Sequence, residues 1–195
     1  MYSVKKMRKV FINAGANKGS DIKRFQELYG NDWEIFAFEV EPQCFEHLEK
    51  YNVNIVKKAV STKDGKDTFS KGVTTLSGTL RKDKDSKNMD PWGKTYEVET
   101  IDFSKWIKEN FSKDDEIIMS MDIEGSEYDV INKMIEDDTL SYINKLYIET
   151  HEYCLKDIDA LDDIGFKQKL IKLMGKNVYM FRYYQHEEFE RLNVH

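Results

Sequence analysis

The sequence predicts an α/β fold, in which helices cover both faces of a mostly parallel, doubly wound sheet. Two observations predict it. Short apolar segments rich in Ile, Val, Phe and Tyr alternate along the chain with stretches of helical periodicity. Most of these segments are nearly continuous in apolar character, which is typical of strands that helices cover on both faces. The 195 residues suit one domain with a sizeable core.

The expected elements follow one another along the whole chain. The strands are residues 10–14, 34–39, 54–61, 116–122, 145–151 and 177–184. Three apolar stripes at helical spacing should face the core: Ile22, Phe25 and Leu28; Phe45, Leu48 and Tyr51; and Tyr128, Ile131, Met134 and Ile135. Pro42 lies near the expected start of the second helix, a position that proline favours.

Residues 69–98 interrupt this alternation. Three glycines, one proline and many Ser, Thr and Lys residues leave little apolar periodicity in the segment. Connections of this length are commonly lids or binding loops, or else disordered surface insertions. We expect a mobile loop beside the ligand site, inserted in a single domain of residues 1–195. That domain is either a whole protein or one part of a longer one.

Charge and cysteine content narrow the class of protein. The net charge is -6, with basic and acidic residues interleaved, which argues against nucleic-acid binding. No apolar run is long enough for a membrane span, and residues 1–9 are too few and too charged for a signal peptide. Cys44 and Cys154 match no zinc or redox spacing, so we expect free thiols in a reducing, cytoplasmic compartment. Nothing in the sequence indicates an oligomeric state.

A glycine-containing turn follows the first strand. Gly15 and Gly19 leave room where a backbone passes close to a ligand. Glu39 ends the second strand about twenty residues later, where a carboxylate can accept both hydroxyls of a ribose. Asn17 stands where a dinucleotide fingerprint has the glycine that admits a pyrophosphate. The turn therefore predicts a nucleoside without a pyrophosphate, commonly S-adenosylmethionine (SAM); the alternative is a turn whose glycines serve packing alone.

Polar residues also end two later strands. Asp122 and Glu124 alternate, so their side chains share one side of the strand end, and Glu149 and His151 do the same. Glu127 falls in the first turn of a helix, where its charge complements the helix dipole. His151 is a candidate general base near neutral pH. Alternatively, two or three of these groups hold a divalent metal, or they form a solvated rim.

Taken in order, these blocks resemble the FkbM family of SAM-dependent methyltransferases over roughly residues 10–151. The resemblance rests on Asn13-Ala14-Gly15-Ala16-Asn17-Lys18-Gly19, Phe38-Glu39-Val40-Glu41-Pro42, Ala59-Val60, Val98-Glu99-Thr100-Ile101-Asp102, Met121-Asp122-Ile123-Glu124-Gly125-Ser126-Glu127 and Ile148-Glu149-Thr150-His151. It implies a Rossmann-like class I methyltransferase fold. It also implies O-methylation of an acceptor hydroxyl on a sugar, a glycan or a glycosylated small molecule, with residues 69–98 as the acceptor-side loop.

The resemblance also implies site residues. Gly15, Ala16, Asn17 and Gly19 would line the methionine part of SAM, Glu39 would bind the ribose, Ala59 would lie near the adenine, and Asp122 and Glu124 would border the transferred methyl. The family usually has Asp where this chain has Asn13, which lacks the charge that would pair with the SAM ammonium. Asp21 is the candidate to supply that charge.

Methyl transfer to a hydroxyl requires the acceptor oxygen in line with the methyl group and a means of removing its proton. Asp122, Glu124 and His151 are the candidate catalytic residues, with His151 as the base and Asp122 orienting the acceptor or holding a divalent metal. Two other functions remain open from the sequence. One is a non-catalytic SAM-binding or nucleoside-binding module that docks a partner, and the other is a nicotinamide dehydrogenase, which the missing G-x-G disfavours.

Overall fold

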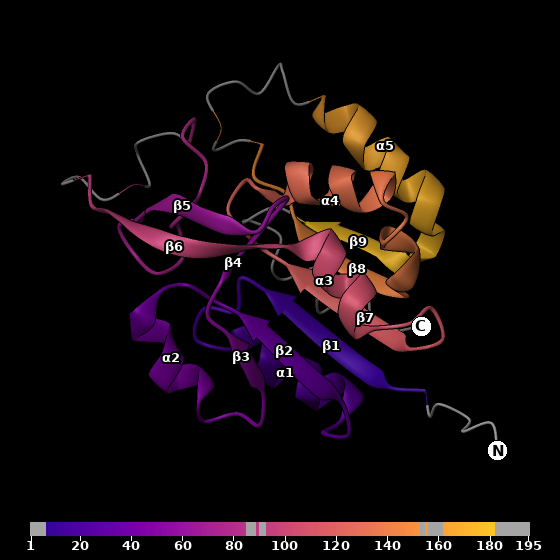
Figure 1. Cartoon of the computed structure of the whole chain (residues 1–195). Helices are drawn as coiled ribbons and strands as arrows, with labels where there is room; N and C mark the ends of the chain where they lie inside the picture. Colours follow the sequence, from indigo (N-terminus) through magenta and orange to yellow (C-terminus); the bar gives the residue numbers. More distant parts are fainter. Residues whose placement is uncertain (1–6, 85–88, 90–92, 153–154, 156–161, 182–195) are drawn as a thin grey trace.

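The computed structural model describes residues 7–84, 89, 93–152, 155 and 162–181 (Figure 1). In this part of the chain the central sheet has six strands in the order β3-β2-β1-β7-β8-β9. The strands are β1 (Lys9–Ala14), β2 (Glu34–Phe38), β3 (Asn54–Val56), β7 (Glu116–Met121), β8 (Lys145–Glu149) and β9 (Val178–Phe181). Every neighbouring pair is parallel, which confirms the predicted α/β fold with a doubly wound sheet.

The order of the strands reverses between β1 and β7. From β1 the chain proceeds through β2 to β3 at one edge, and from β7 through β8 to β9 at the other. At the shared border, Asn13 lies opposite Ser120, and Ala14 lies opposite Met121. Ligands of open α/β sheets bind at such a reversal, outside the carboxyl ends of the strands.

Helices cover both faces of this sheet (Figure 1). Helices α1 (Ser20–Tyr29) and α2 (Pro42–Leu48) pack on one face, and α3 (Phe103–Asn110), α4 (Glu127–Glu136) and α5 (Asp163–Met174) pack on the other. Two short 3-10 turns, Leu140–Tyr142 and Gly175–Asn177, precede β8 and β9. Strand β1 shows the alternation: Val10 and Ile12 are buried with α3, α4 and α5, whereas Phe11 is buried with α1.

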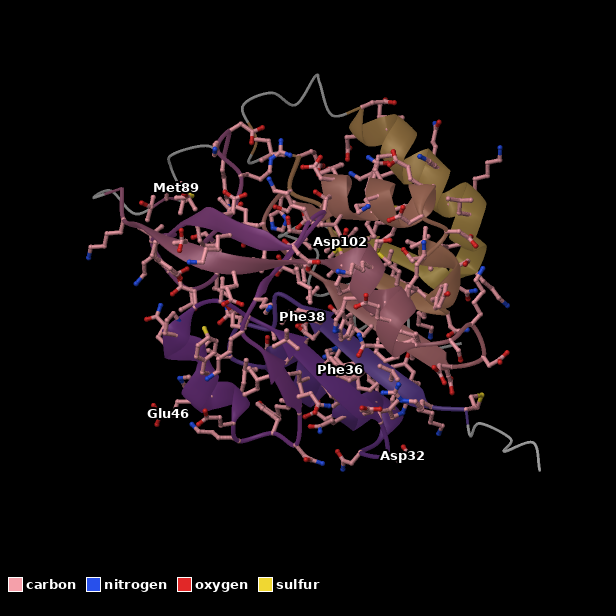
Figure 2. The ribbon with its side chains drawn as sticks, viewed as in Figure 1. Asp32, Phe36, Phe38, Glu46, Met89 and Asp102 are labelled. Atoms are coloured by element: carbon pink, nitrogen blue, oxygen red, sulfur yellow. The ribbon has the colours of Figure 1, made fainter. Side chains whose placement is uncertain are left out.

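Strand β2 alternates in the same way. Phe36 and Phe38, both labelled in Figure 2, make edge-to-face contacts with Trp106 of α3, with ring centroids 5.3 and 4.8 Å apart. Ile35 and Ala37 face α1 instead. This packing brings the carboxyl end of β2 beside that of β1.

A second, three-stranded sheet in the order β4-β6-β5 lies beside the first. It consists of β4 (Ala59–Ser61), β5 (Gly65–Ser70) and β6 (Thr95–Asp102), with β5 and β6 antiparallel. The predicted strand 54–61 is therefore wrong as one element. The chain leaves the central sheet at Lys57 and Lys58, so that β3 pairs with β2 while β4 pairs with β6.

Other differences concern the ends of elements and what was not predicted. Strands β2, β7 and β8 end one or two residues earlier than expected, so Glu39, Asp122 and His151 lie in the loops just beyond them. Helices α3 and α5 and strands β5 and β6 were not predicted. Leu28 is 44% exposed and does not belong to the core stripe assigned to it.

No helix in the described ranges has both the length and the apolar character needed to span a bilayer.

Candidate active site

A cavity of about 790 Å³ opens at the carboxyl ends of β1, β2, β7 and β8, where the strand order reverses. Its wall is strongly acidic. Of the described residues, seven acids line it (Asp21, Glu27, Glu39, Glu41, Asp122, Glu124 and Glu149) against three basic side chains (Lys23, Arg24 and Lys58). Such a wall favours a cationic ligand and disfavours a polyanionic one.

The turn after β1, residues 15–19, forms one wall of this cavity through Gly15, Ala16 and Asn17. The N–H groups of Gly15 and Ala16 donate to the Phe38 carbonyl at 3.1 and 2.9 Å, which ties the turn to the end of β2. A Cβ at Gly15, where φ is +85°, would lie 1.8 Å from the carbonyl oxygen of Asp122. Glycine is therefore required at this position by the neighbouring strand end.

Gly19 is required for a similar reason. A Cβ added there, at φ +87°, would lie 2.6 Å from the Tyr51 ring. Gly19 does not line the cavity. Of the two glycines singled out from the sequence, only Gly15 borders the ligand space, and both are fixed by protein packing.

Glu39 lies at the edge of the cavity with its carboxylate held by the main chain. Its Oε1 accepts from the N–H groups of Val40 and Glu41 at 2.6 and 2.7 Å, and its Oε2 accepts from the Asn17 N–H at 2.7 Å. Burial raises the pKa of Glu39, and these three N–H groups act in the opposite direction. A carboxylate has about four acceptor sites, so about one is left for a ligand, which suits one ribose hydroxyl better than two.

Asn13 and Asp21 have different places. Asn13 is 1% exposed and does not line the cavity, and its Nδ2 has no hydrogen-bond partner among the described residues. Asp21 does line the cavity, and its Oδ2 accepts from the Ser120 hydroxyl at 2.8 Å. From the sequence, both residues are candidate neighbours of the SAM ammonium. In the structure, only Asp21 of the two lines the cavity. Ala59 also lines the cavity, from the side of the second sheet.

At the other end of the cavity, four carboxylates surround the ring of His151. We call Asp122, Glu124, Glu127, Glu149 and His151 the carboxylate cluster. Nδ1 of His151 lies 3.0 Å from Oε1 of Glu127. Nε2 lies 3.6, 3.5 and 3.7 Å from carboxylate oxygens of Asp122, Glu124 and Glu149, respectively. These distances bring Asp122, Glu124, Glu149 and His151, which follow two neighbouring strands, together at one edge of the sheet.

The cluster perturbs its own ionisation. Burial acts to lower the pKa of His151, but the charges of Glu127, Asp122 and Glu124 and the hydrogen bond to Glu127 outweigh it and raise the pKa to about 10. Partial desolvation is the first cause of a raised pKa at Asp122, whose side chain stays 37% exposed toward the cavity; the nearby Glu124 and Glu149 add to it and His151 opposes it. These shifts favour the protonated form of the His151 ring and make Asp122 a more basic carboxylate than usual.

The surroundings of His151 differ from those expected for a general base. A neutral imidazole near the ligand was predicted, but the His151 side chain is 3% exposed, does not line the cavity and has a raised pKa. The reason is the number of carboxylates around it, which the sequence spacing did not reveal. Asp122, whose side chain is 37% exposed, and Glu124 do line the cavity.

Glu127 has the structural role that its place in the chain indicated. It is the first residue of α4 and is fully buried. Its two carboxylate oxygens accept from the N–H groups of Ile123 and Gly125, both at 2.8 Å, and so fix the turn between β7 and α4. Potential ligand atoms of Asp122, Glu127 and His151 lie within 4.8 Å of one another. Glu127 already accepts these hydrogen bonds and contacts His151, so a metal at this triad would compete with them.

Part of the predicted acceptor-side loop covers this end of the cavity. We call residues 71–84 the covering loop; it supplies Thr75, Leu76, Gly78 and Leu80 to the cavity wall. The buried ammonium of Lys84 contacts the Glu124 carboxylate, and the Thr79 hydroxyl donates to the Glu124 carbonyl at 2.7 Å. No local sequence signal distinguishes Lys84 from the other lysines around it. The remainder of the predicted acceptor-side loop includes Trp92, which lies outside the described residues.

Comparison with known proteins identifies the family. The profile of the methyltransferase FkbM domain matches residues 13–167, which include the turn after β1, Glu39 and the whole carboxylate cluster. Searches of curated proteins and of solved structures found no match. The match spans most of the chain, and the six-stranded parallel sheet agrees with it. The chain therefore belongs to the FkbM methyltransferase family.

Proposed function

We propose that this chain is a SAM-dependent O-methyltransferase that acts on a hydroxyl of a sugar, a glycan or a glycosylated small molecule. The observation that carries the proposal is the acid-lined cavity at the reversal of strand order, with the turn of residues 15–19 and Glu39 on one side and Asp122 and Glu124 on the other. Family membership supports methyl transfer, and the cavity supports the choice of cofactor.

The charge of the cavity suits SAM. SAM carries a sulfonium, an ammonium and one carboxylate, so its net charge is positive, and seven acids face it against three bases. A pyrophosphate would face the same acids at a cost. Asn17, with φ +47°, also occupies the place of the glycine that admits a pyrophosphate. Both observations favour SAM over a nicotinamide dinucleotide.

Particular residues fit particular parts of SAM. The backbone at residues 15–17 and the carboxylate of Asp21 would border its methionine part, Glu39 would accept from its ribose, and Ala59 would lie beside its adenine. When bound, SAM supplies a methyl group already activated by the sulfonium. The protein must then hold the acceptor oxygen in line and take its proton.

The acids beyond β7 suit that task. Asp122 faces the cavity and its pKa is raised, so it accepts a proton more readily than an ordinary carboxylate. Glu124 also faces the cavity and would orient the acceptor hydroxyl. His151 would act as a buried cation that holds these carboxylates together. We therefore assign the general base to Asp122, with His151 as its support.

Binding of SAM is tested first, by calorimetry on the whole chain with SAM and with NAD. We expect SAM to bind and NAD not to bind. Glu39→Ala should weaken SAM by about 1.5–3 kcal/mol, the usual contribution of a hydrogen bond to a charged group. Glu46→Ala, an exposed acid of α2 in Figure 2, is the control and should have no effect. Equal SAM affinity in the two variants would contradict the placement of the ribose.

Turnover is tested with radiolabelled SAM and a panel of methyl glycosides, with and without EDTA. Label on a glycoside supports the proposal, and loss of it with EDTA followed by rescue with a divalent ion would instead assign a metal to the cluster. Tight SAM binding without transfer to any glycoside would favour the alternative, a non-catalytic module that docks a partner. The replacement of the family's Asp by Asn13, a change that removes a charge, is the observation that keeps this alternative open.

A further inference from the structure

The covering loop holds a buried lysine against an acid of the cavity. The Lys84 side chain is 1% exposed, its Nζ contacts the Glu124 carboxylate, and it also donates to the Ser77 carbonyl at 2.9 Å. Lysine is almost never buried without a charged partner, because its ammonium loses its hydration. The pairing with Glu124 is therefore what allows Lys84 to lie inside the protein.

Glu124 is fixed from two directions by the same loop. Its backbone has φ +58°, a left-handed conformation that is unfavourable for a residue with a side chain. The Thr79 hydroxyl holds the Glu124 carbonyl while Lys84 holds its carboxylate. Both the conformation and the direction of Glu124 thus depend on where the covering loop lies.

The two oxygens of the Glu124 carboxylate have different contacts. Lys84 and His151 both approach Oε2. Within the described ranges, no donor to Oε1 is found, and the Glu124 side chain lines the cavity and is 15% exposed. An ionised carboxylate held by two cations on one oxygen keeps the other oxygen as an acceptor.

The covering loop also reaches the cofactor end of the cavity. The side-chain amide of Asn17 donates to the Thr75 carbonyl at 3.0 Å. Thr75, Leu76, Gly78 and Leu80 then line the space between that contact and Glu124. One loop therefore joins the turn after β1 to the acid that faces the acceptor.

Resting on the proposed function, we propose that Lys84 is a positioning residue for methyl transfer. By binding Oε2 of Glu124 it directs Oε1 toward the cavity, where Oε1 accepts a hydrogen bond from the acceptor hydroxyl. Because Lys84 belongs to the covering loop, this acceptor site is complete only when the loop lies against the end of β7.

The test compares Lys84→Met, which removes the ammonium and keeps an unbranched apolar side chain, with Lys84→Arg and Lys82→Met. Lys82 is exposed in the same loop and is the matched control. With the glycoside that the wild type methylates best, Lys84→Met should lower kcat about tenfold or more, while SAM affinity changes less than twofold. Lys84→Arg should recover most of the activity, and Lys82→Met should match the wild type. Equal kcat in Lys84→Met and Lys82→Met would overturn the proposal.

A second readout needs no acceptor. Trypsin cleavage after Arg81 in the SAM-bound protein should be several-fold faster in Lys84→Met than in the wild type, and close to wild type in Lys84→Arg. If Lys84→Met fails to fold, Lys84→Met/Glu124→Gln removes the unpaired acid; we expect it to fold, to bind SAM and to be cut as fast. Cleavage of these variants after Arg81 at the rate of the wild type would overturn the proposal. A wild type that does not bind SAM would refute the proposed function instead, and cleavage without SAM would still test the loop contact.

Discussion

The two ends of the cavity are held by different kinds of group. At the end where we propose that SAM binds, here called the cofactor end, backbone N–H groups hold the Glu39 carboxylate, and backbone carbonyls hold the turn after β1. At the end with the carboxylate cluster, here called the acceptor end after the proposed function, charged side chains hold one another: His151 among four carboxylates, and Lys84 against Glu124. The first end therefore depends mainly on backbone conformation. The second depends on ionisation and on which charges are present, so pH and substitutions should affect the two ends differently.

The largest effect should come from the contact that joins the two ends. Gly15→Ala would place a Cβ 1.8 Å from the Asp122 carbonyl at a residue with φ +85°, so both ends must shift. We expect a loss of about 3 kcal/mol or more in the free energy of unfolding, measured with urea, and loss of SAM binding.

Gly93→Ala is the matched control. Its φ of +62° is also left-handed, but an added Cβ meets no atom of the described residues within 4 Å. Gly93→Ala should therefore lower the free energy of unfolding only by the cost of a left-handed backbone at alanine, about 1–2 kcal/mol. Equal losses in the two variants would mean that the close approach of Gly15 to Asp122 is unimportant.

A loss of similar size in stability, but without loss of SAM binding, should depend on pH. The folded protein raises the pKa of His151 to about 10 from an unfolded value of about 6.5. Protonated His151 thus contributes stability that is fully present below about pH 6.5 and is lost as the pH rises to about 10. His151→Gln should destabilise the protein by about 3–5 kcal/mol at pH 6, as expected for a buried charge pair that loses one partner, and by much less at pH 10.

Urea unfolding across this pH range checks the sign. His47→Gln, on α2 and outside the cluster, should leave the pH dependence of the wild type unchanged. A His151→Gln effect that grows with pH would show that the ring is neutral in the folded protein, as the sequence first suggested. It would restore His151 as the candidate base.

The smallest effect should come from a charged pair outside both ends. Lys66 and Glu97 pair at 2.6 Å across β5 and β6, with both side chains largely exposed. Solvent and salt screen such a pair. Lys66→Met should leave the urea midpoint, SAM affinity and turnover unchanged within error. A clear loss would mean that the second sheet contributes more to the site than its contacts indicate.

The same contrast explains what could be predicted from the sequence. The cofactor end rests on short motifs: the Gly15 turn and the acid at the end of β2 were identified because a strand, a turn and a helix follow directly in the chain. Strands β5 and β6 were missed because polar residues fill their exposed positions, as in β5, where only Phe69 is buried.

At the acceptor end, the positions of the residues could be predicted but their ionisation and burial could not. Asp122, Glu124 and His151 were located because they follow the expected ends of strands. The charge of His151 follows from carboxylates contributed by separate segments, and the burial of Lys84 follows from a partner forty residues away. Such long-range pairings depend on the tertiary fold, and a polar stretch of sequence gives no sign of them.

Cys44 makes the cofactor end accessible to a chemical measurement. Its side chain is fully buried on α2, and its thiol donates to the Asn17 side-chain carbonyl at 3.5 Å. Burial, with Glu39 and Glu41 nearby, raises its pKa to about 12, so the reactive thiolate is scarce. In a Cys154→Ser background, the rate of alkylation at Cys44 therefore measures how often α2 separates from the turn of residues 15–19 and exposes the thiol. A ligand that holds the turn closed should slow that reaction in proportion to its occupancy.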